Sequence, residues 1–277
     1  MSMSMSKSRN NTVNTNNKSP FSRRDLFKTG IGVAGALVAT RSVAQVCDLT
    51  TGEQPLGPFF PRAGTPEDPI RESQDPTTPI HLANDNDLTF VRGRAGIATG
   101  QRIYVRGKVT NEACQPLAHA TLIIWQASAS GRYNHTGDAE NADFRHPLTG
   151  ETVRRVLDPA FQYWGRTATD ENGEYTFKTV VPGFYPADLR GGWYRPPHIH
   201  FLVSATGYPQ FVTQMYFRGE AIADNDWIQE LNRRDALLQS PQLTDAQREE
   251  LVVHFKEDPT GAISDGLVGQ FDITLKR

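Results

Sequence analysis

The feature that most constrains the fold of this chain is a series of short extended segments separated by turn-forming residues. Between Ile103 and Val109, apolar residues and glycine alternate with Tyr, Arg and Lys, which is the period-two pattern of a half-buried strand. Further strands are expected at residues 120–126, 174–181, 198–205 and 211–217. Asp170-Glu-Asn-Gly173 and similar clusters supply the turns between them. This spacing predicts an all-β protein with a β-sandwich core.

Helix is expected only in the C-terminal part. Residues 224–238 predict a pair of short helices, and Thr244-Asp-Ala-Gln247 resembles a capping box that opens a helix to about Lys256. Alternation of Phe271, Ile273 and Leu275 with polar residues then predicts a closing strand. Residues 101–277 should therefore form one domain, a β-sandwich with long loops and a short C-terminal helical segment.

Two segments fall outside this strand pattern. Residues 45–100 contain Gly57-Pro-Phe-Phe-Pro61 and many further turn-forming residues, so we expect an arm that wraps over the domain. Phe59 or Phe60 is expected to close one side of a pocket. Residues 134–164 are polar and too long for a simple hairpin, which predicts a functional loop or lid.

The first 44 residues read as an export signal. Ser22-Arg-Arg-Asp-Leu-Phe-Lys28 is a twin-arginine pattern, and the apolar run at 29–40 is too short to span a bilayer. Small residues at Ser42-Val43-Ala44 suit a signal peptidase. We therefore predict a Tat signal peptide, a periplasmic or extracellular mature chain of 277 − 44 = 233 residues, and no stable membrane anchor. The alternative is a disordered basic tail.

Charge and cysteine content narrow the class of protein. The formal net charge is −2, from 29 Lys and Arg against 31 Asp and Glu, so no nucleic-acid partner is expected. Both cysteines, Cys47 and Cys114, lie in the predicted mature chain. An oxidising compartment would permit a disulfide between them, and two free buried thiols are the alternative.

The strongest candidate for chemistry is the segment from Trp193 to Phe201, which contains His198-Ile-His200. Histidines at i and i+2 of a strand project from the same face, so both imidazoles can converge on one metal ion. A pair of half-exposed strand histidines is the alternative. Tyr185 lies in a turn just upstream and Tyr133 follows an earlier strand. Two phenols and two imidazoles suit a hard, oxidised iron.

At this point the ordered motifs carry a family resemblance. From about Gly100 onward, the chain resembles the intradiol ring-cleaving catechol dioxygenases, most closely the iron-bearing β subunits of protocatechuate 3,4-dioxygenases. The matching segments are Gly131-Arg-Tyr133, Leu157-Asp-Pro-Ala-Phe161, Arg166-Thr-Ala-Thr-Asp-Glu-Asn-Gly-Glu-Tyr175, Pro182-Gly-Phe-Tyr-Pro186, Arg195-Pro-Pro-His-Ile-His-Phe201 and Thr213-Gln-Met-Tyr-Phe217. Gly57-Pro-Phe-Phe-Pro61 is also similar to the family's N-terminal Gly-Pro-aromatic segment.

The resemblance implies a cofactor and a reaction. Tyr133, Tyr185, His198 and His200 match the family's Fe(III) ligands, and phenolate oxygens favour Fe(III) over Fe(II). The implied reaction is cleavage of a catechol-type aromatic diol by O2 to a cis,cis-muconate-type diacid. Tyr185 would act both as a ligand and as the base that takes one phenolic proton.

Two further residues match family positions. Arg195 corresponds to the arginine thought to stabilise the carbanion-like form of the substrate, and a salt bridge to a neighbouring loop is its alternative role. Gln214 corresponds to a glutamine near the metal pocket, and a buried amide that caps a loop is the alternative. Trp125 and Tyr175 are assigned to the core.

Two matters are not settled by the resemblance: which substrate the chain accepts and with which subunits it assembles. Ala187 stands where the protocatechuate β subunit has a tryptophan, so whether the ring bears a carboxylate is open. The resemblance allows either a homo-oligomer or an α-type partner subunit.

Two rival interpretations remain. One is an exported prealbumin-like β-sandwich module that binds or supports structure without catalysis. The other is a cupin-type metal site, which needs a glutamate and a later histidine near His198 and His200. Glu220 and His254 are poorly placed for that role, because one lies in a turn and the other in a predicted helix.

Overall fold

The computed structural model describes residues 47, 49–60, 85–138 and 143–277. The predicted signal peptide at 1–44 and residues 61–84 of the predicted arm lie outside these residues. Within them the chain is built mainly from strands, so the predicted all-β class is confirmed.

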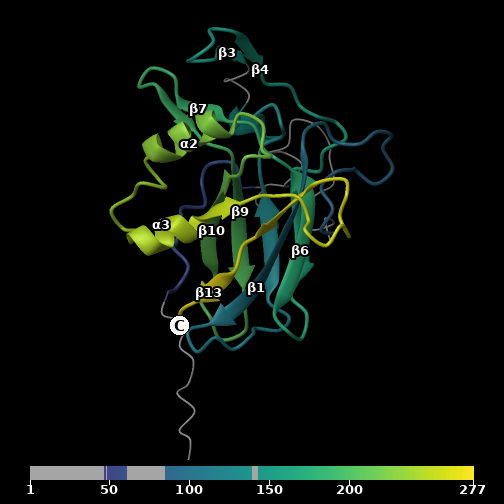
Figure 1. The fold of residues 1–277 in the computed structure, drawn as a ribbon, viewed down its shortest axis with the longest axis vertical. Coiled ribbons are helices and arrows are strands. Elements are labelled where there is room, and N and C mark those ends of the chain that lie inside the picture. Colours follow the sequence, from purple (N-terminus) through teal and green to yellow (C-terminus); the bar gives the residue numbers. More distant parts are fainter. Residues whose placement is uncertain (1–46, 48, 61–84, 139–142) are drawn as a thin grey trace, which may run out of the picture. The chain divides into compact units, whose positions relative to one another are not determined.

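Two sheets form the main body (Figure 1). In the first, β1 (Arg102–Asn111) pairs with β6 antiparallel and with two C-terminal strands in parallel. The bounds of those partners are β6 Glu174–Val180, β12 Leu267–Gln270 and β13 Ile273–Leu275. Burial alternates along β1 as its sequence predicts, with Ile103, Val105 and Val109 pointing inward. The closing strand predicted around Phe271 is in fact two short strands on either side of this residue.

The second sheet has the strand order β11-β10-β9-β2-β5. Its strands are β2 Thr121–Trp125, β5 Trp164–Ala168, β9 His198–Ser204, β10 Phe211–Arg218 and β11 Val252–His254. Strand β9 is central and is antiparallel to both β10 and β2. The strand that carries His198 and His200 is therefore held from both sides.

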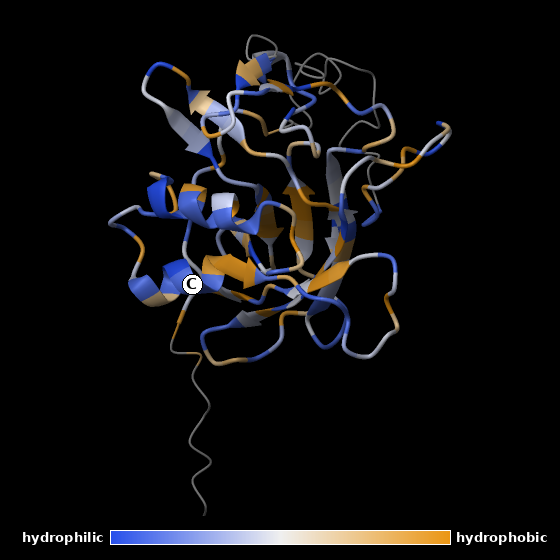
Figure 2. Cartoon of the chain, turned by 45° about the horizontal axis from the view of Figure 1, so that its top comes forward, coloured by the Kyte–Doolittle hydropathy of each residue, from blue (hydrophilic) through white to orange (hydrophobic). Residues whose placement is uncertain are grey.

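Aromatic side chains join the two sheets into one core. Phe201 of β9 contacts Phe177 of β6 and Phe271 with ring centroids 6.3 and 5.1 Å apart, and all three side chains are buried. These contacts form the predicted sandwich core, since the facing sides of both sheets are excluded from water. Figure 2 shows hydrophobic residues on the central strands and mostly hydrophilic ones on the helices. No helix among the described residues is long and apolar enough to cross a membrane.

The C-terminal helices are shorter than predicted. Instead of a helix pair at 224–238 there is one helix, α2 (Asn225–Arg234). It ends because Asp235 adopts an extended conformation, and its carboxylate accepts bonds from the amides of Leu237 and Leu238. The capping box at Thr244 is present, but α3 (Asp245–Leu251) ends five residues before Lys256. The next residues instead form β11 in parallel with β10, a long-range pairing that local propensity does not reveal.

Two hairpins were not predicted. Within the 134–164 segment lie a 3-10 turn, η1 (Thr136–Asp138), and the paired strands β3 (Asp143–Arg145) and β4 (Thr152–Arg154). Strand β7 (Tyr185–Asp188) pairs with β8 (Trp193–Arg195). Both hairpins lie at the upper end of the view in Figure 1, together with α2.

The N-terminal arm is attached along the body. A disulfide joins Cys47 to Cys114, which confirms the first of the two alternatives for these cysteines. Further along, the Thr51 amide donates to the carbonyl of Thr274, and the Gln54 amide donates to that of Val212. The arm therefore reaches the second sheet at β10, beside the histidine strand.

Candidate metal centre

The register of the second sheet gathers polar and aromatic side chains around the two histidines. His200 lies directly opposite Gln214 of β10 on one side and Trp125 of β2 on the other. His198 lies opposite Tyr216 of β10. Directly opposite residues share a face of the sheet. All five residues therefore face the same way, which confirms the prediction that both imidazoles project from one face.

The structure brings the two predicted tyrosines to this face. The Tyr133 hydroxyl lies 3.3 Å from Nε2 of His198, and the Tyr185 hydroxyl lies 3.5 Å from the same atom. The rings of His198 and His200 are 4.9 Å apart between centroids. None of the four side chains is more than 5% exposed. Residues from three separate parts of the chain therefore meet in one buried cluster.

The tautomer of His198 follows from its contacts. Its Nδ1 lies 2.7 Å from the carbonyl of Pro196, which can only accept, so Nδ1 carries the hydrogen. Burial and the nearby charge of Arg195 lower the pKa of His198 well below its ordinary value, which keeps the ring neutral. Nε2 therefore presents a lone pair towards both tyrosine hydroxyls, the arrangement required of a metal-binding imidazole.

His200 is held by stacking on an aromatic neighbour. Its ring lies parallel to that of Trp125, with centroids 4.6 Å apart and an interplanar angle of 8°. Burial and Arg195 also lower the pKa of His200 well below its usual range. Nδ1 of His200 is buried and has no hydrogen-bond partner among the described residues. Trp125, which we assigned to the core, is buried as predicted and also sets the orientation of this imidazole.

The two phenols differ in their electrostatic surroundings. Burial raises the pKa of Tyr133 well above its ordinary value, and the neighbouring Tyr185 adds to this effect. Burial also raises the pKa of Tyr185, while the positive charge of Arg195 and a hydrogen bond with Tyr133 oppose that rise. A phenolate at either position requires a compensating positive charge, which a bound cation supplies.

The position of Tyr133 depends on a buried ion pair. The carboxylate of Asp138, in η1, accepts hydrogen bonds from the Tyr133 backbone amide at 2.7 Å and from Nη2 of Arg155 at 2.8 Å. Arg155 also donates to the carbonyl of Gly131, and its guanidinium lies 5.5 Å from the centre of the Tyr185 ring. Gly131 itself has φ +77°, and a Cβ there would lie 2.4 Å from the carbonyl oxygen of Phe184. The predicted lid segment thus contributes structural support for both tyrosines.

Arg195 lies beside the cluster and is held by several partners. Its Nε donates to Asp235 at 2.7 Å, and its Nη2 donates to Gln214 at 2.7 Å and to Tyr216 at 3.2 Å. The salt bridge that was the alternative role for Arg195 therefore exists. Arg195 is also close enough to influence the pKa values of both histidines and both tyrosines, and its effect on substrate charge stays a prediction.

Gln214 is a buried amide with two fixed contacts. Besides accepting from Arg195, it donates from Nε2 to the carbonyl of Pro55 at 2.9 Å. The predicted cap on a loop is thus present, and the loop belongs to the N-terminal arm. The same face holds Tyr216, which we did not single out. Its position two residues after Gln214 in a strand could have indicated it.

The aromatic residues of the arm cover the cluster. Phe59 lies 4.6 Å from Tyr133 and 6.1 Å from Tyr185 between ring centroids. Phe60 lies 4.7 Å from Trp125. The close approach of the arm requires glycine at position 57, which has φ +77° and where a Cβ would lie 3.2 Å from the His200 ring. Both phenylalanines therefore line this side of the site, where we expected one of them.

Two further histidines of the described chain lie at the surface, away from the cluster. His119 and His254 are exposed and lie 3.2 Å from Glu171 and Glu220, respectively. His254 was expected in a helix and in fact lies at the end of β11, so the argument against a cupin site now rests on its exposed contact with Glu220. In the described part of the chain, no three or more His, Cys, Asp or Glu side chains are arranged to hold a metal ion.

A ferric ion fits the donor set that is present. Donor atoms that share one small cation lie roughly 3 Å apart, and the oxygen-to-nitrogen distances of 3.3 and 3.5 Å around His198 are close to this. Low pKa values keep both imidazoles neutral, and Nδ1 of His200 is buried without a hydrogen-bond partner among the described residues. Two hard phenol oxygens with two imidazoles suit Fe(III).

Comparison with known proteins gives a consistent result. A family model described as Dioxygenase matches residues 77–276. The β chain of protocatechuate 3,4-dioxygenase from Burkholderia cepacia is 33% identical over 215 residues, which cover 75% of this chain and 81% of that protein. Catechol 1,2-dioxygenase from Candida albicans is 27% identical over 172 residues, 58% of this chain and 46% of that protein. The matched region thus spans about half of the second relative.

A solved structure agrees at the level of the fold. The 3-chlorocatechol 1,2-dioxygenase from Rhodococcus opacus 1CP superposes with a TM-score of 0.50 and 22% identity, covering 82% of this chain and 72% of that one. At this identity the likeness concerns the backbone arrangement alone.

Proposed function

This chain belongs to the intradiol ring-cleaving dioxygenases, a family of oxidoreductases, and we propose that it uses ferric iron to cleave a catechol-type diol with O2. The proposed product is a cis,cis-muconate-type diacid. The observation that carries the proposal is the buried meeting of Tyr133 and Tyr185 with His198, beside His200. A prealbumin-like binding module is not favoured, because it gives no reason for these four side chains to converge.

In this proposal Tyr133, Tyr185, His198 and His200 hold the metal. Ferric iron, when bound, acts as a Lewis acid that favours the deprotonated diol and makes its ring reactive towards O2. Each imidazole contributes a neutral nitrogen, and each tyrosine contributes an anionic oxygen once its proton has left. Trp125 and the Pro196 carbonyl keep the two imidazoles in place.

Tyr185 is assigned a second role as a base. A catechol must lose two phenolic protons to bind as a dianion; the ionised Tyr185 oxygen takes one of them and a hydroxide from solvent takes the other. Two features suit it to this role better than Tyr133. The hydrogen bond between the two tyrosines opposes the effect of burial on the pKa of Tyr185, whereas it raises the pKa of Tyr133 further. Tyr185 also begins a short two-stranded hairpin, whereas the Tyr133 backbone is tied to the buried Asp138.

Arg195 and Gln214 act on the substrate side of the cluster in this mechanism. The guanidinium places a fixed positive charge where negative charge develops on the ring, and a charge held in advance stabilises a transition state without reorganisation. Gln214 holds Nη2 of Arg195 and connects it to the arm at Pro55. Phe59 covers the two tyrosines and keeps water from them.

The first test is a visible absorption spectrum of the purified mature protein, before and after anaerobic addition of catechol. We expect a broad tyrosinate-to-Fe(III) charge-transfer band that shifts with catechol, and formation of a muconate absorbance when air is admitted. Protocatechuate, tested in parallel, decides whether a ring carboxylate is accepted. Activity of this chain alone would show that it does not need an α-type partner, and light scattering of the same sample would report a homo-oligomer.

Two outcomes would contradict this proposal in different ways. A colourless protein without metal by elemental analysis would support the binding-module interpretation. A colourless protein that contains metal would indicate a different site around His198 and His200.

We also propose that the chain is exported by the Tat system. The twin-arginine pattern at Arg23 and Arg24 motivates this, and a disulfide at Cys47–Cys114 suits an oxidising compartment. In a Tat-competent bacterium, the variant with both arginines changed to lysine should remain in the cytoplasm with reduced thiols, while the wild-type protein appears outside it. Equal export of the two forms would contradict the proposal, and thiol alkylation of each fraction reports the disulfide.

A further inference from the structure

The orientation of Arg195 is determined by residues outside the metal cluster. Arg195 is 5% exposed, and a buried guanidinium without partners would be free to turn or to draw in water. Its Nε is bound by Asp235 and its Nη2 by Gln214 and Tyr216. Of these, Asp235 supplies the negative charge, and its carboxylate is 0% exposed.

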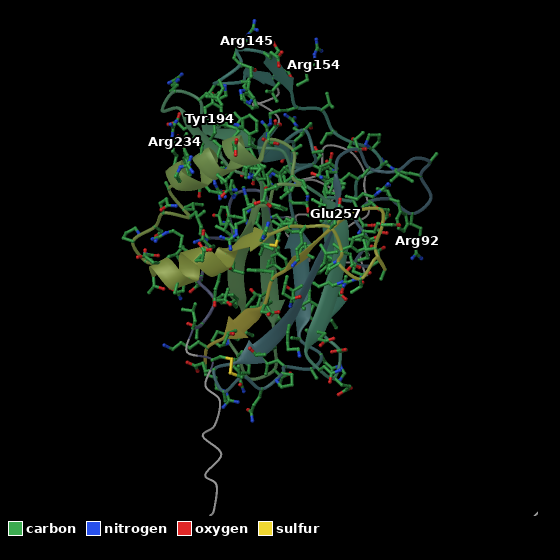
Figure 3. All side chains as sticks on the ribbon, in the orientation of Figure 1. Arg92, Arg145, Arg154, Tyr194, Arg234 and Glu257 are labelled. Carbon is green, nitrogen blue, oxygen red and sulfur yellow. A yellow bond between two sulfur atoms is a disulfide. The ribbon has the colours of Figure 1, made fainter. Side chains whose placement is uncertain are left out.

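Asp235 is itself rigidly placed. It follows the last residue of α2 in an extended conformation. Oδ1 of Asp235 accepts hydrogen bonds from the backbone amides of Leu237 and Leu238 at 3.1 and 2.8 Å. Oδ2 is therefore left to accept the hydrogen bond from Arg195. Its neighbour Arg234 projects outward from α2 in Figure 3. At the end of the helix, Arg234 therefore points to solvent and the next residue, Asp235, points towards Arg195.

Tyr216 provides a second anchor and links it to the arm. Its hydroxyl lies 3.2 Å from Nη2 of Arg195, 3.5 Å from Oδ1 of Asp235 and 3.2 Å from Oε1 of Gln54. Gln54 in turn donates to the carbonyl of Leu237, in the same turn as Asp235. Three separate segments thus close a hydrogen-bonded ring around one side of the guanidinium.

We propose that Asp235, with Tyr216 as a second anchor, is the positioning residue that sets the orientation of Arg195 for ring cleavage. This inference rests on the proposed function. A fixed positive charge stabilises a developing negative charge only if its position is held, and an error of about 1 Å can cost about 100-fold in rate. Asp235 acts through Arg195, so its effect should depend on Arg195 being present.

The test is a double-mutant cycle on the iron-loaded enzyme. We expect Asp235→Asn to lower kcat about 10- to 100-fold. KM should change only a few-fold, and iron content and the charge-transfer band should be retained. In an Arg195→Ala background, the same substitution should change kcat less than about two-fold. Glu249→Gln is the matched control, because it breaks an exposed ion pair between Glu249 of α3 and Arg218 of β10 and should leave kcat unchanged.

Several results would overturn the inference. An iron-loaded Asp235→Asn enzyme with wild-type kcat would do so, as would an equal loss of kcat in both backgrounds. If Asp235→Asn does not fold, Tyr216→Phe removes an anchor without leaving a charge unpaired. It should lower kcat several-fold only when Arg195 is present, and an equal loss in both backgrounds counts against the proposal. A wild-type enzyme that cleaves no catechol would overturn the proposed function as well.

Discussion

Replacing Tyr185 by phenylalanine is expected to lower kcat by about 10²- to 10⁴-fold and to shift the visible absorption of the iron-loaded protein. The rate loss is expected because the substitution removes the base that we propose takes a substrate proton. The colour change follows because a phenyl ring has no oxygen to donate charge to Fe(III). Tyr133→Phe should also change the colour and lower turnover, since it removes the other proposed phenolate ligand.

The matched control is Tyr104→Phe. Tyr104 lies on β1 and donates its hydroxyl to the exposed Asp265, so its loss should change neither the spectrum nor the rate. The measurements are the visible spectrum, iron content and steady-state turnover of all three variants. If both Tyr133→Phe and Tyr185→Phe kept the wild-type spectrum at full iron loading, the assignment of these tyrosines as ligands would be wrong.

Asp138→Ala is expected to lower the free energy of unfolding by about 3–5 kcal/mol and to reduce iron loading. Removing one partner of a buried ion pair leaves the other charge without compensation, and the side chain of Arg155 is 0% exposed. The same substitution deletes the acceptor of the Tyr133 amide, so one of the proposed ligands loses its support. Denaturant unfolding measures the first effect and elemental analysis the second.

The control for this variant is Asp265→Ala. Asp265 pairs with Arg102 and Lys178 at the surface, where ion pairs contribute about 0–1 kcal/mol because water screens them. Its loss should leave iron content unchanged. Equal unfolding midpoints for the two variants would show that the Asp138–Arg155 pair does not stabilise the fold as its burial implies.

Two buried acid–arginine pairs thus flank the candidate centre. Asp138 and Arg155 support the backbone around Tyr133, and Asp235 and Arg195 lie beside Gln214 and Tyr216. They differ in what their loss should affect. The first pair holds the Tyr133 backbone, so its loss is expected to affect stability and metal loading. The second holds the charge that we propose acts on the substrate, so its loss is expected to affect kcat.

Local sequence determined the elements that depend on neighbouring residues. The alternation in residues 103–109 predicted β1 with its inward-facing side, because a strand places every second residue on one face. The capping box at Thr244 predicted the start of α3, because its hydrogen bonds lie within one turn of chain. The spacing of His198 and His200 likewise predicted that both imidazoles share a face.

Only the tertiary structure decided where these elements end and what surrounds the histidines. The helix predicted to reach Lys256 stops at Leu251 because the following residues pair with β10, a strand more than 30 residues earlier. Asp235 leaves the helical conformation where its carboxylate binds Arg195, 40 residues away. Strand register placed Trp125 and Tyr216 beside the imidazoles. Such contacts join residues that are distant in sequence, so no local pattern encodes them, whereas periodicity and capping act over a few residues and can be read directly.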